Sequence, residues 1–338
     1  MSSRKSTIYD LAALAGVSAS TVSAVLSGNW RARRIADETA ERIRALAARH
    51  TFTVNRQASG LRTRRSGLIG MIIPLHDNRF FSGMSQAFEK LARERHRYPI
   101  VVSTLRDPSL ELETARTLIS YRVESLVVAG ATDPDAISDV CRDHGVAHVN
   151  VDLPGTQAMS VISDNFWGAQ QLTQGLLDRS RPQRAARRNR PYFLGGLASD
   201  DATRRRIDGF SDVVRARLGT LDPSQIDACG YEADLAEAAI ARLHARLGGL
   251  PRALFVNSTI ALEGVVRFLK TLPHGELATC SFGCYDWDPF ATMLAFPLLM
   301  VRQDIDGLLD RAFEILDGGS DASAPPRVIE IRPRLVFV

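Results

Sequence analysis

Apolar residues follow two different spacings along the chain, and the change falls near residue 66. Up to that point they recur at the spacing of one face of a helix, as at Val22, Val25 and Leu26. From Gly67 onward, short apolar runs alternate with helical patterns. The runs lie at 68–74, 99–105, 125–130, 147–153, 191–197, 253–258 and 276–283, and helical patterns lie at 84–94, 109–121, 165–178, 204–218, 232–247 and 258–271. The sequence therefore predicts a small helical unit followed by an α/β unit with parallel strands.

The helical unit has the spacing of a helix-turn-helix. Thr7 and Asp10 form the pattern of a capping box before one short helix, and Ser18 is placed to cap a second helix after a turn. The second helix carries small residues opposite its apolar face, and a third helix is predicted from about Asp37 to Arg49. This arrangement is typical of domains whose second helix enters the major groove of DNA.

The charge is unevenly distributed along the chain, and this distribution is more informative than the net value of +4. Residues 1–65 contain 12 Lys and Arg against 4 acidic residues, a net charge of +8, whereas the remainder carries −4. A basic module of this kind favours phosphate backbones, because each phosphate contact releases condensed counterions. A solvated charge cluster is the alternative. Residues 179–190, with six arginines, are interpreted as a solvated loop, with a second nucleic-acid contact as the alternative.

The remaining composition narrows the class of protein. A chain of 338 residues has room for two or three domains. It contains no apolar run of 18 residues and no secretory signal pattern at its start, so we expect a cytoplasmic protein without a membrane partner. Its four cysteines are scattered and form neither a disulfide framework nor a CxxC metal pattern, so no metal site is predicted.

Several stretches resemble the lactose-repressor (LacI/GalR) family of transcription regulators. These are TIYDLAALAGVSASTVSAVLSG, IADETAERI, the hinge pattern N-x-x-A-x-x-L at Asn55, Ala58 and Leu61, and SGLIGMIIP, in this order. The segments SGNWRARRI and ASGLRTRRSGLIGMIIP look most like the fructose-repressor (catabolite repressor/activator) branch. In the remainder, FFSGMSQAFEKLARE, SDNFWGAQQL, RRRIDGF and SFGCYDWDPF followed by MVRQD stand where this family has its ligand-pocket segments.

The resemblance implies an N-terminal all-α helix-turn-helix head and an α/β, two-lobed, periplasmic-binding-protein-like effector domain. The head would span 1–53, a hinge helix and linker 54–66, and the effector domain 67–338. Lobe 1 would contain about 67–163 and 298–320, and lobe 2 about 164–295 and 321–338. A homodimer joined through the effector domains would place two heads on a pseudo-palindromic operator.

The resemblance also assigns DNA-binding positions. Ala19, Ser20 and Ala24 would face base edges, although such small side chains lack the bidentate readout of Arg or Asn. Leu61 would be the wedge that opens a base step in the minor groove, with burial in a core as the alternative. Capping and solvated charge are the alternatives for the polar residues. The full set is Thr7, Ser18, Ala19, Ser20, Thr21, Ser23, Ala24, Arg31, Arg33, Arg34, Asn55, Ala58 and Leu61.

For the effector, Asp164 and Asn165 follow an apolar run and precede a helix, which places them at the edge where α/β sheets bind ligands. Helix capping is the alternative for both. Arg206 resembles the family's pocket arginine, and an aromatic ring at 80 or 81 would stack on a sugar unless it is buried in the core. The full set is Phe80, Phe81, Asp164, Asn165, Arg206, Asp286, Asp288 and Gln303.

We therefore expect a DNA-binding regulator, a repressor of carbohydrate genes, that a sugar or sugar phosphate controls by releasing it from DNA. The sequence alone leaves the direction of this control open. No catalytic residue and no cofactor are predicted, because no glycine-rich phosphate loop, HExxH or GxSxG pattern is present. A periplasmic binding protein without a DNA role and a sugar-metabolising enzyme are the alternatives, and the basic head argues against the first.

Overall fold

The computed structural model describes residues 7–50, 52, 66–180, 187–318 and 325–338. The chain divides into two compact units, Met1–Ser66 and Gly67–Val338. We call the first the head and the second the effector unit.

The described part of the head contains three helices, α1 (Ile8–Ala15), α2 (Ala19–Leu26) and α3 (Asp37–Arg49). Thr7 and Asp10 form the predicted capping box, in which the Asp10 N–H donates to Thr7 Oγ1 at 3.3 Å. Gly16, with φ of +64°, ends α1 in the left-handed conformation that a helix C-terminus favours. The axes of α1 and α2 differ by 103°, and apolar side chains of all three helices form one core, so the predicted helix-turn-helix is confirmed.

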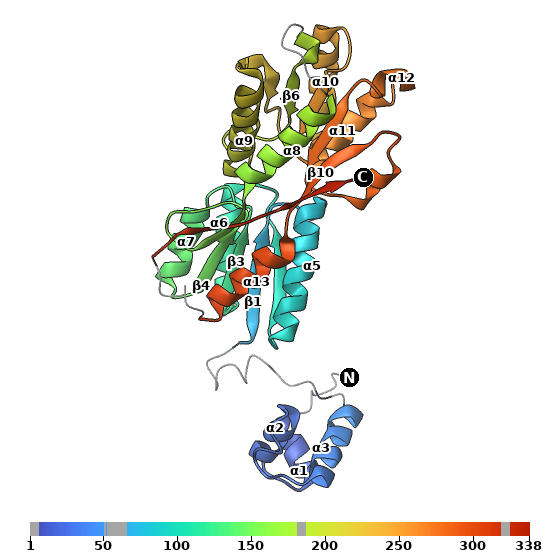
Figure 1. Ribbon diagram of the computed structural model, residues 1–338. Coiled ribbons are helices and arrows are strands. Elements are labelled where there is room, and N and C mark those ends of the chain that lie inside the picture. The colour runs from blue at the N-terminus through green and yellow to red at the C-terminus, as the bar shows by residue number, and fades with distance from the viewer. Residues whose placement is uncertain (1–6, 51, 53–65, 181–186, 319–324) are drawn as a thin grey trace. The chain divides into compact units, whose positions relative to one another are not determined.

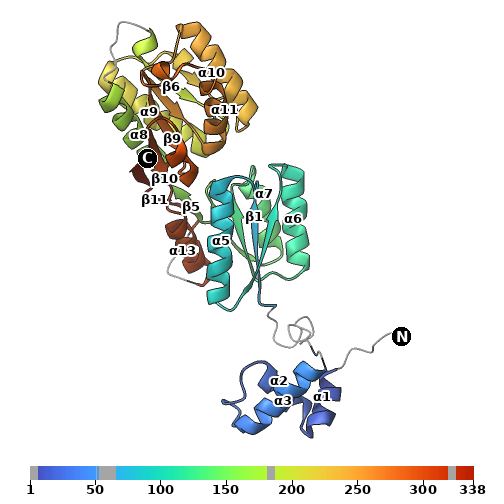
Figure 2. The same ribbon diagram turned by 90° about the vertical axis from the view of Figure 1, so that its right-hand side faces the viewer.

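The first sheet of the effector unit has six parallel strands in the order β11-β5-β4-β3-β1-β2. Its strands are β1 (Leu68–Ile73), β2 (Tyr98–Ser103), β3 (Ser125–Ala129), β4 (Ala147–Val151), β5 (Ser160–Ser163) and β11 (Val328–Ile331). One face packs on α5 (Arg79–Glu94) and α13 (Ile305–Leu316), and the other on α6 (Pro108–Ser120) and α7 (Pro134–Asp143). Figure 2 shows α5 and α6 on opposite sides of β1. We call this sheet with its helices lobe 1.

The second sheet has the order β12-β10-β9-β8-β6-β7, in which β12 alone is antiparallel to its neighbour. Its strands are β6 (Pro191–Leu194), β7 (Ile226–Asp227), β8 (Ala253–Val256), β9 (Ser281–Tyr285), β10 (Leu298–Arg302) and β12 (Arg334–Phe337). α8 (Asn165–Ser180) and α9 (Asp201–Leu218) pack on one face, and α10 (Ala233–Leu247) and α11 (Thr259–Leu269) on the other. The short α12 (His274–Leu277) and the 3₁₀ turns η1 (Arg187–Asn189), η2 (Pro223–Gln225) and η3 (Pro289–Met293) complete this lobe 2, seen at the top of Figure 1.

The chain crosses between the lobes three times, and two crossings differ from the prediction. The crossing after β5 lies where the sequence placed it. The expected assignment of 298–320 to lobe 1 is wrong for β10, which pairs with β9 in lobe 2, and the assignment of 321–338 to lobe 2 is wrong for β11, which pairs with β5 in lobe 1. The chain passes from one sheet to the other after 302 and again after 331. Strand pairing, rather than the apolar runs, decides which sheet each strand joins.

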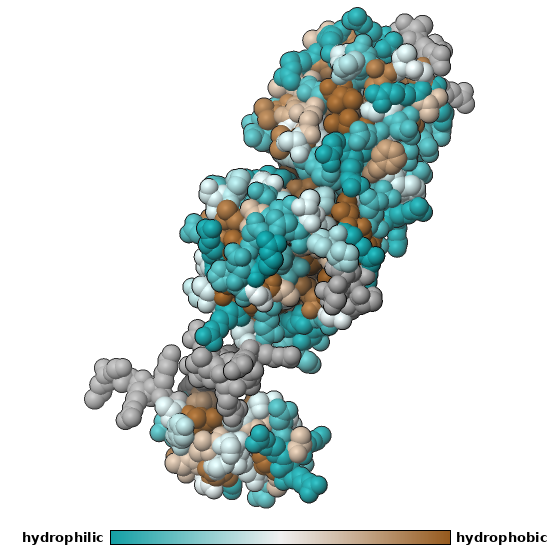
Figure 3. Space-filling view, turned by 90° about the vertical axis from the view of Figure 1, so that its left-hand side faces the viewer, coloured by the Kyte–Doolittle hydropathy of each residue, from teal (hydrophilic) through white to brown (hydrophobic). Residues whose placement is uncertain are grey.

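The surface of the effector unit is mostly hydrophilic on the side that Figure 3 shows, with apolar side chains in scattered patches. Among the described residues, no single helix is long and apolar enough to cross a membrane, and α1 and α2 meet that length and composition only as a pair with a sharp bend.

Candidate functional site

Polar side chains converge where strands of both sheets end. Asp152 directly follows β4 of lobe 1, whereas Asn257, Asp286 and Gln303 directly follow β8, β9 and β10 of lobe 2. The carboxyl ends of parallel strands are the usual place for ligands in α/β proteins. Together with neighbours from α8, α9 and the loops, these residues form what we call the polar cluster. It comprises Arg106, Asp152, Asn165, Asp200, Arg206, Tyr231, Asn257, Asp286 and Gln303.

Arg206 is the buried cation of the polar cluster, and only 3% of it is exposed. Its Nε donates to Asn165 Oδ1 at 2.8 Å, and one terminal nitrogen donates to the Asn257 carbonyl at 2.8 Å. Its guanidinium carbon lies 3.7 Å from the centre of the Tyr285 ring. Burial alone would lower the pKa of this guanidinium, but the charge of Asp286 and its neighbours outweighs burial and raises the pKa. The arginine therefore stays charged inside the protein and is fixed in one orientation.

Three carboxyl groups of both lobes surround this arginine. Burial, reinforced by the charges of Asp200 and Asp286, raises the pKa of Asp152 to about 7, although Arg206 and Arg106 oppose the shift. Burial also raises the pKa of Asp286, against the effect of Arg206 and of a 2.5 Å hydrogen bond that Gln303 Nε2 donates to it. Burial and the neighbouring carboxyl groups therefore penalise the charged form of Asp152, and burial penalises that of Asp286.

Tyr231 connects the carboxyl groups to lobe 1. Its hydroxyl donates to Asp200 Oδ2 at 2.6 Å and lies 2.8 Å from the hydroxyl of Thr203. The guanidinium carbon of Arg106, from the loop after β2, lies 4.7 Å from the centre of the Tyr231 ring. Since Arg106 belongs to lobe 1 and Tyr231 to lobe 2, this cation–π contact links the lobes beside the carboxyl groups.

Several buried polar atoms of the polar cluster have no hydrogen-bond partner within the described chain. Three of them are acceptors, on Asp200 (Oδ1), Asn257 (Oδ1) and Gln303 (Oε1), and two are donors, on Asn165 (Nδ2) and Arg106 (Nε). A buried polar group without a partner costs roughly 1–3 kcal/mol, so a concentration of them at one place points to a ligand that supplies the missing bonds. Water is the other molecule that would satisfy them.

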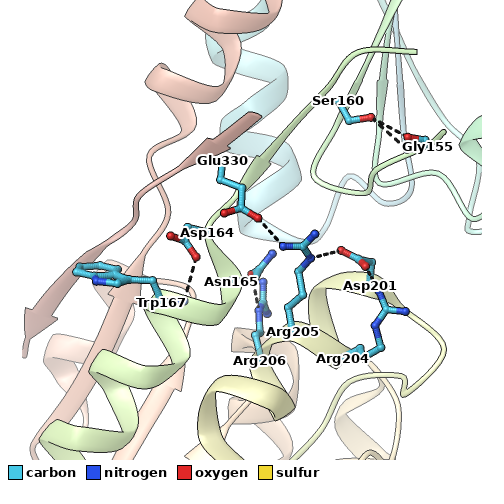
Figure 4. Close-up of polar contacts among 10 residues, drawn as sticks. All are labelled: Gly155, Ser160, Asp164, Asn165, Trp167, Asp201, Arg204, Arg205, Arg206 and Glu330. Atoms are coloured by element: carbon cyan, nitrogen blue, oxygen red, sulfur yellow. Dashed lines mark hydrogen bonds and ion pairs between the residues drawn. The ribbon is translucent and has the colours of Figure 1, made fainter. Parts of the chain in front are cut away.

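The structure brings together four of the residues that the sequence proposed for the effector. Asn165, Arg206, Asp286 and Gln303 all lie in the polar cluster. Figure 4 shows that the side chains of Arg204, Arg205 and Arg206 do not all point to the same partner. Arg206 points to Asn165, whereas its two neighbours pair with Asp201, and Arg205 also pairs with Glu330 of lobe 1.

The other four proposed effector residues lie outside the polar cluster. Asp164 caps α8, since its carboxylate accepts the Trp167 N–H at 3.0 Å (Figure 4). Asp288 is paired with Arg79 of lobe 1 at 2.7 Å and caps η3, so it lies in a contact between the lobes outside the polar cluster. Phe80 and Phe81 are buried in the lobe 1 core, because α5 begins at 79, five residues before the predicted helix. The structure therefore does not bring these four residues into the polar cluster.

Sequence reasoning missed Arg106, Asp152, Asp200, Tyr231 and Asn257. Two of them had a usable signal. The apolar runs 147–153 and 253–258 were recognised, and Asp152 and Asn257 are the polar residues at their carboxyl ends. Arg106, Asp200 and Tyr231 lie in loops further from the strand ends, and no pattern in the sequence distinguishes them.

The predicted DNA-binding residues on α2 and at the N-caps of α1 and α2 fall into three groups. Thr7 and Ser18 cap α1 and α2, which was the alternative for such polar residues. Ser20 is exposed, and Ala19, Thr21 and Ser23 are half-buried. Ala24 is only 5% exposed, which leaves little of its side chain to contact a base edge.

The three loop arginines of the head are exposed, while other predictions fall on residues that the structure leaves undescribed. Arg31, Arg33 and Arg34 all have solvent-accessible side chains. Asn55, Ala58 and Leu61, and the central part of the arginine-rich segment 179–190, lie outside the described residues. Within the described ranges, no group of three His, Cys, Asp or Glu residues is arranged to hold a metal ion.

Comparisons with known proteins agree with this architecture. Residues 7–55 match the model of bacterial regulatory proteins of the lacI family, and residues 66–271 match that of periplasmic binding proteins and the sugar-binding domain of the LacI family. The ribitol operon repressor of Klebsiella aerogenes is 50% identical over 181 residues, 54% of this chain and 67% of that protein. The catabolite repressor/activator of Salmonella typhimurium is 26% identical over 335 residues, 94% of this chain and 93% of that protein.

Among solved structures, the lac repressor dimer bound to operator and an anti-inducer matches with a TM-score of 0.78 at 22% identity, covering 98% of each chain. This likeness extends over the head and both lobes and shows the fold. The two family models together cover well over half of the sequence. The chain therefore belongs to the LacI family of bacterial regulatory proteins, as a DNA-binding transcription regulator whose body is of the family's sugar-binding type.

Proposed function

We propose that the effector of this regulator is a neutral polyhydroxyl compound, a linear polyol or a sugar without phosphate, bound at the polar cluster. The unpartnered acceptors on Asp200, Asn257 and Gln303 carry this proposal. A hydroxyl group both donates and accepts a hydrogen bond, so a chain of hydroxyls satisfies acceptors and donors that alternate around a site.

The charge of the polar cluster disfavours a sugar phosphate. Three carboxyl groups face two guanidinium groups. Of these, Arg206 already donates to Asn165 and Asn257. A phosphate brings a charge of about −1.5 to −2 at pH 7 and mainly accepts hydrogen bonds, whereas three of the five unpartnered atoms named above are acceptors that need a donor. Of the two effector classes that the sequence left open, the neutral one fits these residues better.

The likeness to a relative named for a ribitol operon supports the same choice. Ribitol is a neutral five-carbon polyol. A molecule of this kind presents a row of hydroxyl groups and no charge, which matches the donors and acceptors of the polar cluster.

Binding at this place would couple the effector to DNA through the lobes. The polar cluster draws Asp152 and Arg106 from lobe 1 and the remaining groups largely from lobe 2, so a ligand in contact with both stabilises one arrangement of the lobes over another. By linkage, a ligand that prefers one arrangement changes DNA affinity, and DNA changes ligand affinity by the same factor. We propose that the effector releases the protein from its operator.

Calorimetry on the full-length chain tests the effector class. Ribitol, xylitol and D-arabinitol would be compared with fructose 1-phosphate and inorganic phosphate. We expect a neutral polyol to bind and the phosphates not to bind. Tighter binding of fructose 1-phosphate than of any neutral compound would overturn the proposal. The release step is tested separately, by the effect of the bound polyol on affinity for a duplex that the protein selects from a random library.

A pair of variants ties the binding to the polar cluster. Arg206→Lys keeps the charge but cannot donate to Asn165 and Asn257 with the same fork geometry. We expect it to weaken polyol binding at least tenfold. Arg204→Lys is the matched control, because Arg204 lies two residues earlier on α9 and pairs with Asp201. This variant should bind the polyol with the affinity of the wild type. Equal affinities of the two variants would remove the polar cluster as the effector site.

We further propose that the protein acts as a cytoplasmic homodimer without catalytic activity. The lac repressor whose fold it shares is a dimer bound to operator, and the relatives named above are repressors. Two-fold symmetry would place two heads on a pseudo-palindromic site. Sedimentation equilibrium of the full chain tests the dimer, and incubation with the polyol followed by product analysis tests the lack of catalysis.

A further inference from the structure

The loop between α2 and α3 of the head is closed on itself by backbone hydrogen bonds. The Ile35 N–H donates to the Trp30 carbonyl at 3.0 Å, and the Arg34 N–H donates to the Arg31 carbonyl at 3.0 Å. Arg34 has φ of +54°, in the left-handed region that non-glycine residues rarely adopt. A loop with this backbone needs support from side chains that hold its two ends.

Trp30 supplies contacts of that kind at the base of the loop. Its indole packs against the head core, and its Nε1 donates to Asp37 Oδ1 at 3.0 Å. The guanidinium carbon of Arg44 lies 4.1 Å from the ring centre, and that of Arg31 lies 5.4 Å away. Asp37 and Arg44 are seven residues apart on α3, which places them two turns apart on one face of the helix. The indole therefore binds the loop to α3 at two points.

The loop carries three exposed cations, on Arg31, Arg33 and Arg34. Exposed arginine side chains lose much conformational freedom when they bind a phosphate, so a fixed backbone beneath them lowers the cost of the contact. Trp30 itself is uncharged and half-buried. Because the indole has no charge to offer a phosphate, it can add to phosphate binding through the arginines that it holds in place.

We propose that Trp30 is a positioning residue for DNA binding, which holds the arginine loop 29–35 on α3 so that its guanidinium groups meet the phosphate backbone. This inference rests on the DNA-binding function. It adds to that function a residue that carries no charge.

The salt dependence of DNA binding separates positioning from a merely structural role. Each phosphate contact contributes about −0.9 to the slope of log Kobs against log salt concentration. A substitution that only weakens folding of the head lowers affinity equally at all salt concentrations and leaves this slope unchanged. Loss of the arginine contacts makes the slope shallower, even though Trp30→Ala removes no charge.

The experiment measures this slope for the full-length chain on the best duplex that the wild-type protein selects from a random library. We expect Trp30→Ala to reduce the slope by about 0.9 or more per head, one phosphate contact or more. Trp30→Phe, which keeps a ring for Arg44 but loses the N–H, should recover most of the slope. Removing the three guanidinium groups together, in Arg31→Gln/Arg33→Gln/Arg34→Gln, sets the full contribution of the loop.

The double-mutant cycle gives the decisive outcome. In the background of the triple arginine variant, Trp30→Ala should change the slope no further, because the groups through which it acts are gone. An unchanged slope for Trp30→Ala in the wild-type background would overturn the proposal, and so would an equal change in both backgrounds. Failure of the wild-type protein to select any duplex would instead refute the DNA-binding function, so the two failures are distinguishable.

Discussion

The buried carboxyl group of Asp152 makes a quantitative prediction about stability and pH. In an unfolded chain its pKa is near 3.8, whereas burial and the charges of Asp200 and Asp286 raise the pKa to about 7 in the folded protein. Between these two values the folded state holds a proton that the unfolded state has lost. Folding stability therefore falls as pH rises from about 4 to about 7. The sign is opposite to that of a carboxylate held in a salt bridge.

The magnitude follows from the two pKa values. At about 1.4 kcal/mol per pKa unit, the difference corresponds to roughly 4 kcal/mol across the whole window. Asp152→Asn removes the titration and replaces it with a constant offset, since the amide is neutral at every pH. The free energy of unfolding of the wild type, minus that of the variant, should therefore fall by about 1.4 kcal/mol per pH unit between pH 5 and 6 and level off above pH 7.

Urea unfolding of the full-length proteins at pH 5, 6, 7 and 8 measures this difference. Asp310→Asn, the same exchange at an exposed position on α13, is the matched control. Asp286→Asn should shift the sloping window to lower pH, because it removes one of the charges that raise the Asp152 pKa. A difference for Asp152→Asn that stays constant or rises with pH would refute the electrostatic reasoning about the polar cluster.

Three further predictions concern packing, the independence of the units, and proton release. A Cβ on Gly264 would lie 1.9 Å from the Ala233 carbonyl oxygen where α10 and α11 pack, so Gly264→Ala should lower the free energy of unfolding by about 1–3 kcal/mol. Gly275→Ala is the control, because the space around Gly275 is open, and equal urea midpoints for the two variants would contradict the packing. Leu11→Ala should destabilise the head by about 2–5 kcal/mol and weaken DNA binding while leaving calorimetric polyol affinity unchanged, and a parallel loss of polyol binding would show that the two units are not independent. If polyol hydroxyls donate to Asp152, binding near pH 6 should release protons, which calorimetry in buffers of different ionisation enthalpy detects; uptake of protons would exclude that contact.

Local patterns were sufficient to predict the helix-turn-helix and most strands of the effector unit. The limits of α3 agree with the prediction, because the acidic start and the apolar spacing of that helix are both local features of the sequence. The sheet that β10 or β11 joins was not predictable in this way. Both are short strands, and the choice depends on β9 and β5, with which they pair.

The same limit explains which site residues were found. Successive residues on a helix point about 100° apart, so Arg204, Arg205 and Arg206 project in three directions, and only the position of α9 against the strand ends selects the last one. Asp286 and Asp288 are two residues apart. The first lies directly after β9 and is buried, whereas the second lies far enough along the loop to pair with Arg79. Sequence reasoning identified both carboxylates as candidates but could not tell that Asp286 is buried more deeply than Asp288.

The backbone of the polar cluster carries strain at the same positions that hold its charges. Arg106, Asp152 and Asp286 have φ of +58°, +72° and +75°, and the two aspartates follow directly on a strand. Left-handed backbone in non-glycine residues costs roughly 1–3 kcal/mol and persists where the surroundings over-determine it. Strain, unpartnered polar atoms and a carboxyl group forced towards neutrality all reduce stability, and their coincidence at one place supports the proposal that the polar cluster binds the effector. If the polar cluster is the effector site, Asp152→Asn should above pH 7 make the protein more stable and weaken its binding of the proposed polyol, two changes in opposite directions that a purely structural role for this residue would not produce.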